Sequence, residues 1–172
     1  GSNVAATGVP AGWSLIASQA SLSNPHVFGY VKVVGQGEPS SYTWGLSSSV
    51  VNSGGIVRYS GVETATPLDV PATTAAGPAA TLGVVPGVTT TRPSAMLVGC
   101  VAINSSSLQS TITAPTGMLQ AWDLGGKRQK LADGLVVAAG ATGTRTWTFN
   151  RKSDWAGWLA ALRPGDSTGY GR

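Results

Sequence analysis

The 172-residue chain has few charged side chains, one cysteine and one histidine. Charged residues make up 10% of the sequence, whereas ordinary globular domains carry about 25%. Serine, threonine, alanine and glycine take their place. This composition suits the exposed faces of β-sheets and makes poor helix surfaces. The low charge therefore weighs against a cytosolic enzyme.

The single cysteine excludes an intrachain disulfide. Cys100 lies in the apolar run 95–101, which predicts a buried, inert thiol. One cysteine and one histidine, His26, also cannot supply a structural zinc site. No run of about 18 apolar residues is present, so no membrane insertion is predicted. Nor does a basic and then apolar leader open the sequence, and Gly1-Ser2 is typical of a cloning scar.

The formal charge of +4 comes from eleven cations that are mostly dispersed along the chain. Only Lys127, Arg128 and Lys130 cluster, in a segment that reads as the tip of a hairpin. A surface that follows a phosphate backbone needs more than one such cluster, so no nucleic-acid partner is predicted. Two interpretations of the cluster remain, a solubilising loop tip and a contact to an anionic partner.

One stretch of the chain occurs twice. Residues 144–164 align with residues 41–61, and the alignment matches Trp147 with Trp44. A second matched pair, PAGW and PTGM, precedes the two copies, at 10–13 and 115–118. We interpret this pattern as the duplication of a strand-rich unit.

Short apolar stretches separated by Gly, Pro and Asn predict strands throughout the chain. They fall at 13–19, 26–35, 41–47, 56–62, 81–85, 94–103, 117–124, 135–141, 144–150 and 155–163. Residues 62–80 contain three prolines and no periodicity, which predicts a long surface connection. The fold class is all-β, an antiparallel β-sandwich, jelly-roll-like and built from two similar halves, with a closed barrel as the alternative. We expect one domain over 3–172 that ends in a flexible tail at 165–172.

The order of several short motifs in this chain is similar to that of a known group of modules. PxGW is followed by G(Y/L)V, by a TW strand, and by a turn with SGV or ALRP. This order resembles β-sandwich modules of exported multi-domain bacterial proteins and of phage tail-associated proteins, especially from high-GC genomes. The resemblance implies an accessory domain at an extracellular or virion surface. It brings no catalytic residue with it.

Motifs for catalysis and cofactors are scarce. His26 has no serine in a nucleophile-elbow motif to accompany it, and the seven acidic residues stand in or beside turns. No nucleotide-binding motif occurs. Calcium is the one cofactor that stays open, because Glu63 and Asp69 flank a single loop and carboxylates with backbone carbonyls form oxygen cages. The chain is therefore predicted not to be an enzyme.

Six tryptophans are many for a chain with so few charged residues, and an exposed indole can stack on a sugar ring. Trp44 and Trp147 stand at equivalent places in the two copies, which favours a core role. Trp155 and Trp158 occur only in the second copy, so the shared fold does not need them. Trp155 follows a polar stretch and is predicted to form an exposed platform. Such a platform could stack on a sugar ring or pack against another domain or another copy of the chain.

These observations favour a non-catalytic attachment or recognition module at an extracellular or virion surface, with glycans among the expected ligands. A structural decoration or spacer domain that contacts protein is the alternative, and a hydrolase is the third hypothesis. The expected partner is a cell-surface glycan or a protein, and a homo-oligomer stays open.

Overall fold

The described residues of this computed structural model, 4–104, 110–123 and 128–165, form strands and no helix. Every strand pair is antiparallel. The predicted fold class, all-β and antiparallel, is confirmed. None of these residues belongs to a helix long and apolar enough to cross a membrane.

The strands are short near the N-terminus and long in the second part of the chain. They are β1 (Ala6–Gly8), β2 (Ser14–Ala20), β3 (His26–Val31), β4 (Gly45–Leu46), β5 (Leu68–Val85), β6 (Thr89–Thr90), β7 (Ala95–Ile103), β8 (Ile112–Thr113), β9 (Leu119–Asp123), β10 (Gln129–Val136), β11 (Gly140–Ala141) and β12 (Arg145–Leu162).

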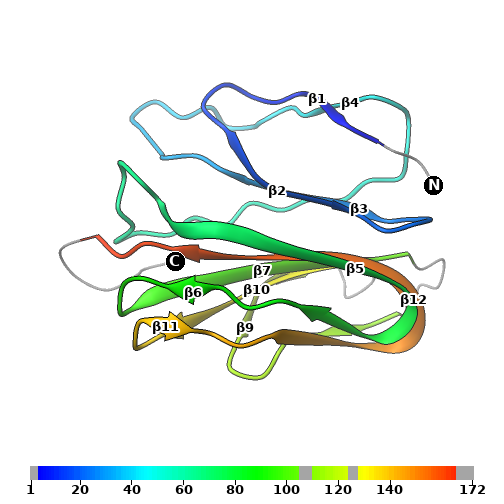
Figure 1. Ribbon diagram of the computed structural model, residues 1–172. Helices are drawn as coiled ribbons and strands as arrows, with labels where there is room; N and C mark the ends of the chain where they lie inside the picture. Colours follow the sequence, from blue (N-terminus) through cyan, green and yellow to red (C-terminus); the bar gives the residue numbers. More distant parts are fainter. Residues whose placement is uncertain (1–3, 105–109, 124–127, 166–172) are drawn as a thin grey trace.

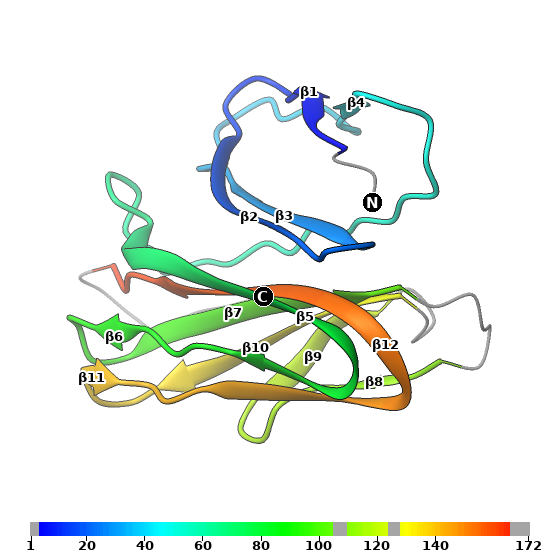
Figure 2. The same cartoon turned by 45° about the vertical axis from the view of Figure 1, so that its right-hand side comes forward.

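The largest sheet has the strand order β5-β12-β7-β10-β9, and β8 pairs with β12 outside this order. The sheet is open, with β5 and β9 at its edges, so the alternative of a closed barrel does not apply to it. Residues 4–62, which we name the N-terminal layer, carry the pairs β1–β4 and β2–β3. Figures 1 and 2 show this layer lying over one face of the large sheet.

The antiparallel pair of β5 and β12 folds over on itself. Near its C-terminal end β12 pairs with β7, through Trp155 to Leu162, whereas near its start it pairs with β8, through Thr148 and Phe149. The register of β12 with β5 shifts between Thr148 and Ser153, where the two strands turn. In Figure 2 the two strands curve around together at this end of the molecule. This strand pair thus contributes to two packed layers, as a sandwich requires.

The large sheet buries both of its faces. Trp147, Phe149 and Leu159 belong to the core cluster on the face that the folded-over pair of β5 and β12 covers. Cys100 and Trp158 belong to a second cluster, which also includes Ala17 and Val27 of the N-terminal layer. A strand covered on both faces has no solvent-exposed face that would require polar side chains. This explains the uninterrupted apolar sequence of β7.

The prediction of a long surface connection at 62–80 is wrong. Most of it belongs to β5, which starts at Leu68 and pairs with β12. Pro71 and Pro78 weighed against a strand in the sequence, because proline lacks the N–H that a central strand needs. Since β5 is an edge strand with only β12 as its ladder partner, prolines are tolerated there.

The two similar halves are not confirmed. Trp147 lies in β12 and is fully buried, whereas Trp44 precedes the two-residue strand β4 and is half-buried in the N-terminal layer. The first copy also lacks the expected strand at 56–62, where an isolated bridge joins Val62 to Pro164. Similar sequence therefore folds into a long strand in one copy and into mostly irregular chain in the other.

The expected ends of the chain fall largely outside the described residues. Residues 1–2, predicted to be a cloning scar, and residues 166–172 of the predicted tail lie outside the described residues. Gly165, the first residue of the predicted tail, is described, and its N–H donates to the carbonyl oxygen of Gly61 at 2.8 Å.

Candidate functional site

The alternating side chains of β3 lie in two different environments. Val27 is 2% exposed and belongs to the cluster against the large sheet, and Gly29 lies against the indole of Trp158. Successive side chains of a strand point to opposite faces. His26, Phe28 and Tyr30 therefore point away from the large sheet, into the N-terminal layer.

These three rings continue into a chain of six aromatic side chains. Centroid distances between successive rings are 4.1 Å (His26–Phe28), 6.4 Å (Phe28–Tyr30), 4.5 Å (Tyr30–Trp44), 5.6 Å (Trp44–Trp13) and 5.3 Å (Trp13–Tyr42). All six side chains are half-buried. We name the set the aromatic strip, and its members are His26, Phe28, Tyr30, Trp44, Trp13 and Tyr42.

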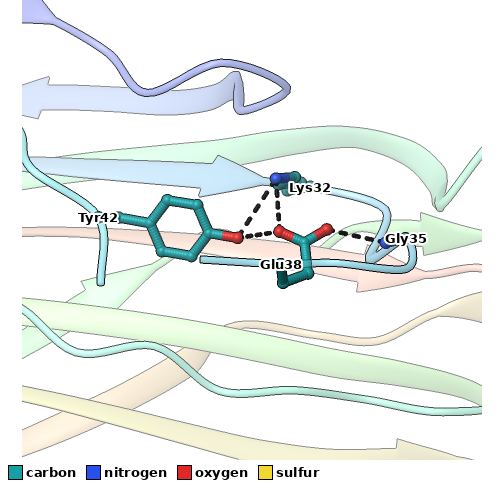
Figure 3. A network of polar contacts seen from close by, with 4 residues as sticks. All are labelled: Lys32, Gly35, Glu38 and Tyr42. Atoms are coloured by element: carbon teal, nitrogen blue, oxygen red, sulfur yellow. Dashed lines mark hydrogen bonds and ion pairs between the residues drawn. The ribbon is translucent and has the colours of Figure 1, made fainter. Parts of the chain in front are cut away.

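A polar network fixes one end of the aromatic strip (Figure 3). The Lys32 ammonium donates to Glu38 Oε2 at 2.6 Å and to the Tyr42 hydroxyl at 3.2 Å. The Tyr42 hydroxyl also donates to Glu38, and the N–H of Gly35 donates to Glu38 Oε1 at 2.8 Å. Hydrogen bonds from Lys32, then Tyr42, then Gly35 lower the pKa of Glu38 from 4.5 to about 2. The network therefore holds the Tyr42 ring in the strip by a charged contact.

We expect this network to open in acid. A carboxyl with a depressed pKa in the folded state stabilises that state above the unfolded pKa of 4.5, and the contribution is lost as the pH falls toward about 2. A side-chain carbon NMR titration of Glu38 should give a pKa near 2. The Lys32→Met variant should raise it toward the ordinary value. Glu38→Gln should remove this part of the acid dependence, and an unchanged dependence would contradict the assignment.

The aromatic strip lines a large cleft of about 1290 Å³. The lining residues also include Cys100, Leu131 and Trp158 of the large sheet, which lie on the other side of β3 from the strip. Lys32 and Glu38 line the same cleft. A concave, mostly apolar space with a few polar groups is the usual form of a small-molecule site.

Among the described residues of this region, His26 makes a contact that resembles catalytic chemistry. Its Nε2 lies 2.9 Å from the Ser18 hydroxyl. Burial lowers the pKa of His26, which a hydrogen bond with the backbone of Val4 partly offsets. A nucleophile–base–acid triad also needs a carboxylate on the imidazole. No hydrogen bond joins His26 to a carboxylate within the part of the chain that the structure describes.

The prediction of Trp155 as an exposed platform is wrong. Its side chain is 6% exposed and belongs to the core cluster beneath the large sheet. The residues after the polar stretch continue β12, whose second half is central in the sheet and covered on both faces. Trp158 is 5% exposed and belongs to the other cluster, but it does line the cleft.

The two described residues of the predicted basic cluster lie in different environments. Lys127 lies outside the described residues, and Arg128 is exposed. Lys130 does not project into water: its side chain is buried and its ammonium lies 3.2 Å from Asp123 Oδ2. The reason is that β10 begins at Gln129, so Lys130 lies within a ladder between β7 and β9 rather than in a hairpin tip.

The two proposed calcium ligands have protein partners. Glu63 Oε1 accepts the N–H of Ala65 at 3.0 Å. Asp69 accepts the N–H and the hydroxyl of Thr91, both at 2.6 Å, and lies 3.5 Å from Arg163 Nε. Burial raises the pKa of Asp69, but the hydrogen bonds from Thr91 and the charge of Arg163 outweigh it and lower the pKa. Within 4–104, 110–123 and 128–165, no three His, Cys, Asp or Glu side chains gather as a metal site.

The aromatic strip is absent from the sequence-based candidates. A local signal exists, because His26, Phe28 and Tyr30 alternate with Val27 and Gly29, and this pattern places rings on one face only. The other members come from separate irregular segments, which no periodicity links to β3.

Comparison with known proteins yields no relative. No protein-family model, no curated protein and no solved structure matches this chain.

Proposed function

We propose that this chain is a non-catalytic recognition module that binds glycans through the aromatic strip, displayed at an extracellular or virion surface. The observation that carries the proposal is the strip itself. Six half-buried aromatic side chains follow one another along the wall of a cleft. A core of the same size would bury such rings fully, as the large sheet does with Trp147.

Sugar rings match this surface in two respects. Their apolar C–H faces can stack on aromatic planes, while their hydroxyl groups need donors and acceptors at the ring edge. The strip offers the planes, and the network of Lys32, Glu38 and Tyr42 offers both donors and acceptors at one end. Since Glu38 is ionised at neutral pH, it can accept hydroxyl hydrogen bonds there.

A glycan array followed by calorimetry tests the proposal. The Phe28→Ala and Trp44→Ala variants should each bind the best array ligand at least tenfold more weakly, because each removes one stacking plane. Trp44→Phe should retain most of the affinity. Leu119→Ala is the matched control, since Leu119 is 70% exposed on β9 and lies outside the cleft.

Two results would overturn this proposal. Equal loss of affinity in Leu119→Ala would show that the strip is not the binding surface. An array without ligands, together with self-association or protein binding that Phe28→Ala abolishes, would assign the strip to a structural spacer or decoration domain instead.

A further inference from the structure

Residues 53–59 of the N-terminal layer line the cleft and lie along β10. The Ser53 hydroxyl donates to the side-chain oxygen of Gln129 at 2.9 Å, and the Tyr59 hydroxyl donates to Asp133 Oδ2 at 2.8 Å. Gln129 and Asp133 both belong to β10. At about 3.3 Å per residue of a strand, they lie roughly 13 Å apart. These contacts hold the two ends of the segment at separate places on the large sheet.

Arg58 is exposed within this segment because its neighbours are anchored. Val57 and Tyr59 are half-buried and pack against the core cluster that the large sheet shares with the N-terminal layer. Arg58 lies between them, is exposed and lines the cleft. Its guanidinium is therefore accessible to a ligand in the cleft.

A second guanidinium lies beyond the other end of the segment. Arg128 comes just before Gln129, is exposed and lines the cleft as well. Its carbonyl oxygen accepts the N–H of Ile103 at 2.8 Å, which fixes its backbone beside β7. The positions of Arg128 and Asp133 are roughly 16 Å apart at about 3.3 Å per residue. Since Arg58 adjoins the tyrosine that contacts Asp133, the cleft holds two positive groups that lie well apart.

The described residues of the chain leave both guanidinium groups without an ion pair or hydrogen bond. The other charged side chains of the described cleft lining are Lys32, Glu38 and Glu63. Lys32 and Glu38 neutralise each other, with 2.6 Å between Nζ and Oε2. Burial lowers the pKa of His26, so it adds no charge at neutral pH. One carboxylate thus remains against two guanidinium groups, and the cleft has a net positive charge.

We propose that the glycan bound by the aromatic strip is acidic, a linear chain of uronic acids whose carboxylates bind Arg58 and Arg128. This inference rests on the proposed function and adds the class of glycan to it. A guanidinium presents a planar fork of donors that fits a carboxylate. The sugar faces stack on the strip, and carboxylates of different sugar units bind the two arginines. A single acidic sugar is too short to reach both.

Uronate oligosaccharides and their methyl esters form matched pairs for the test, since esterification removes the charge and keeps the sugar rings. By calorimetry with oligogalacturonate and oligoalginate, at least one acid should bind at least tenfold more tightly than its ester. In about 1 M NaCl, where the Debye length is about 3 Å, most of this difference should disappear. Equal affinity of acid and ester in both pairs would overturn the inference.

A double variant, Arg58→Gln with Arg128→Gln, separates charge from stacking. It should weaken binding of the acid at least tenfold and binding of the ester less than twofold. Both side chains are exposed and unpaired among the described residues, so the fold should not change. Phe28→Ala should weaken acid and ester alike, because both stack on the strip. Arg151→Gln, exposed and outside the cleft, is the matched control and should alter neither affinity.

The outcomes distinguish this inference from the proposed function. Acid binding that is unchanged in the double variant would overturn the inference and leave glycan binding by the strip in place. The same holds if neutral glycans bind in a manner that Phe28→Ala weakens, while neither uronate binds. An array without any glycan ligand would instead overturn the proposed function, and the inference with it.

Discussion

The Trp147→Ala variant should lose about 3–5 kcal/mol of the free energy of unfolding, the range for a large aromatic side chain removed from a packed core. Trp147 is 0% exposed and packs in the core cluster that the folded-over pair of β5 and β12 encloses. The total free energy of unfolding of a small domain is only about 5–15 kcal/mol. Urea unfolding followed by circular dichroism should show a much lower midpoint, or no folded baseline at all.

Trp44→Ala is the control, because the sequence alignment makes the two tryptophans equivalent and the structure does not. Trp44 is half-buried in the N-terminal layer, so its removal should cost less than half as much. Trp147→Phe keeps a ring and removes an indole N–H that has no partner among the described residues, and should lie between the two. Equal losses in both alanine variants would restore the interpretation of two similar halves.

The Gly29→Val variant should separate the N-terminal layer from the large sheet. Valine is compatible with a strand, so the effect is steric: its Cβ would lie 2.9 Å from the Trp158 ring. Overpacking of this kind costs about 1–3 kcal/mol. A cost of about 1.4 kcal/mol confined to the contact between the layers would raise the open population tenfold.

Cys100 reports this separation directly. It is 1% exposed beneath the N-terminal layer, and burial raises the pKa of its thiol to about 12, against a small opposing effect of the Gln129 amide. The unmodified protein should therefore react very slowly with a thiol reagent until denaturant is added. Gly29→Val should react about tenfold faster.

Gly54→Val provides the comparison for this experiment, since nothing lies within 4 Å of a Cβ built there. Its labelling rate should equal that of the unmodified protein. If Gly29→Val also labels at that rate, the contact of β3 with Trp158 does not hold the layers together.

Strands whose burial follows from local pattern could be predicted from the sequence. The apolar run of β7 identified a strand covered on both faces, and the alternation of β2 placed it correctly. The edge strand β5 could not be recognised, because the tolerance for Pro71 and Pro78 depends on which neighbours the strand lacks.

The candidate site was harder to predict than the fold. Trp155 and Lys130 follow or lie within polar stretches, yet both belong to strands whose neighbours bury them. Local polarity gives no information about a partner strand from elsewhere in the chain. The aromatic strip likewise depends on Trp13 and Trp44 meeting β3 in space.

The folded-over pair of β5 and β12 also constrains how the chain can fold. Leu68 pairs with Leu162, so the two strands that join the layers come from distant parts of the sequence. Such pairings must overcome a large loop-closure entropy before any contact compensates for it, which slows folding. During synthesis, β7 and the N-terminal layer leave the ribosome long before β12, and until then the edge of β7 that pairs with β12 has no partner strand. The time between those two events is when this protein is most exposed to aggregation.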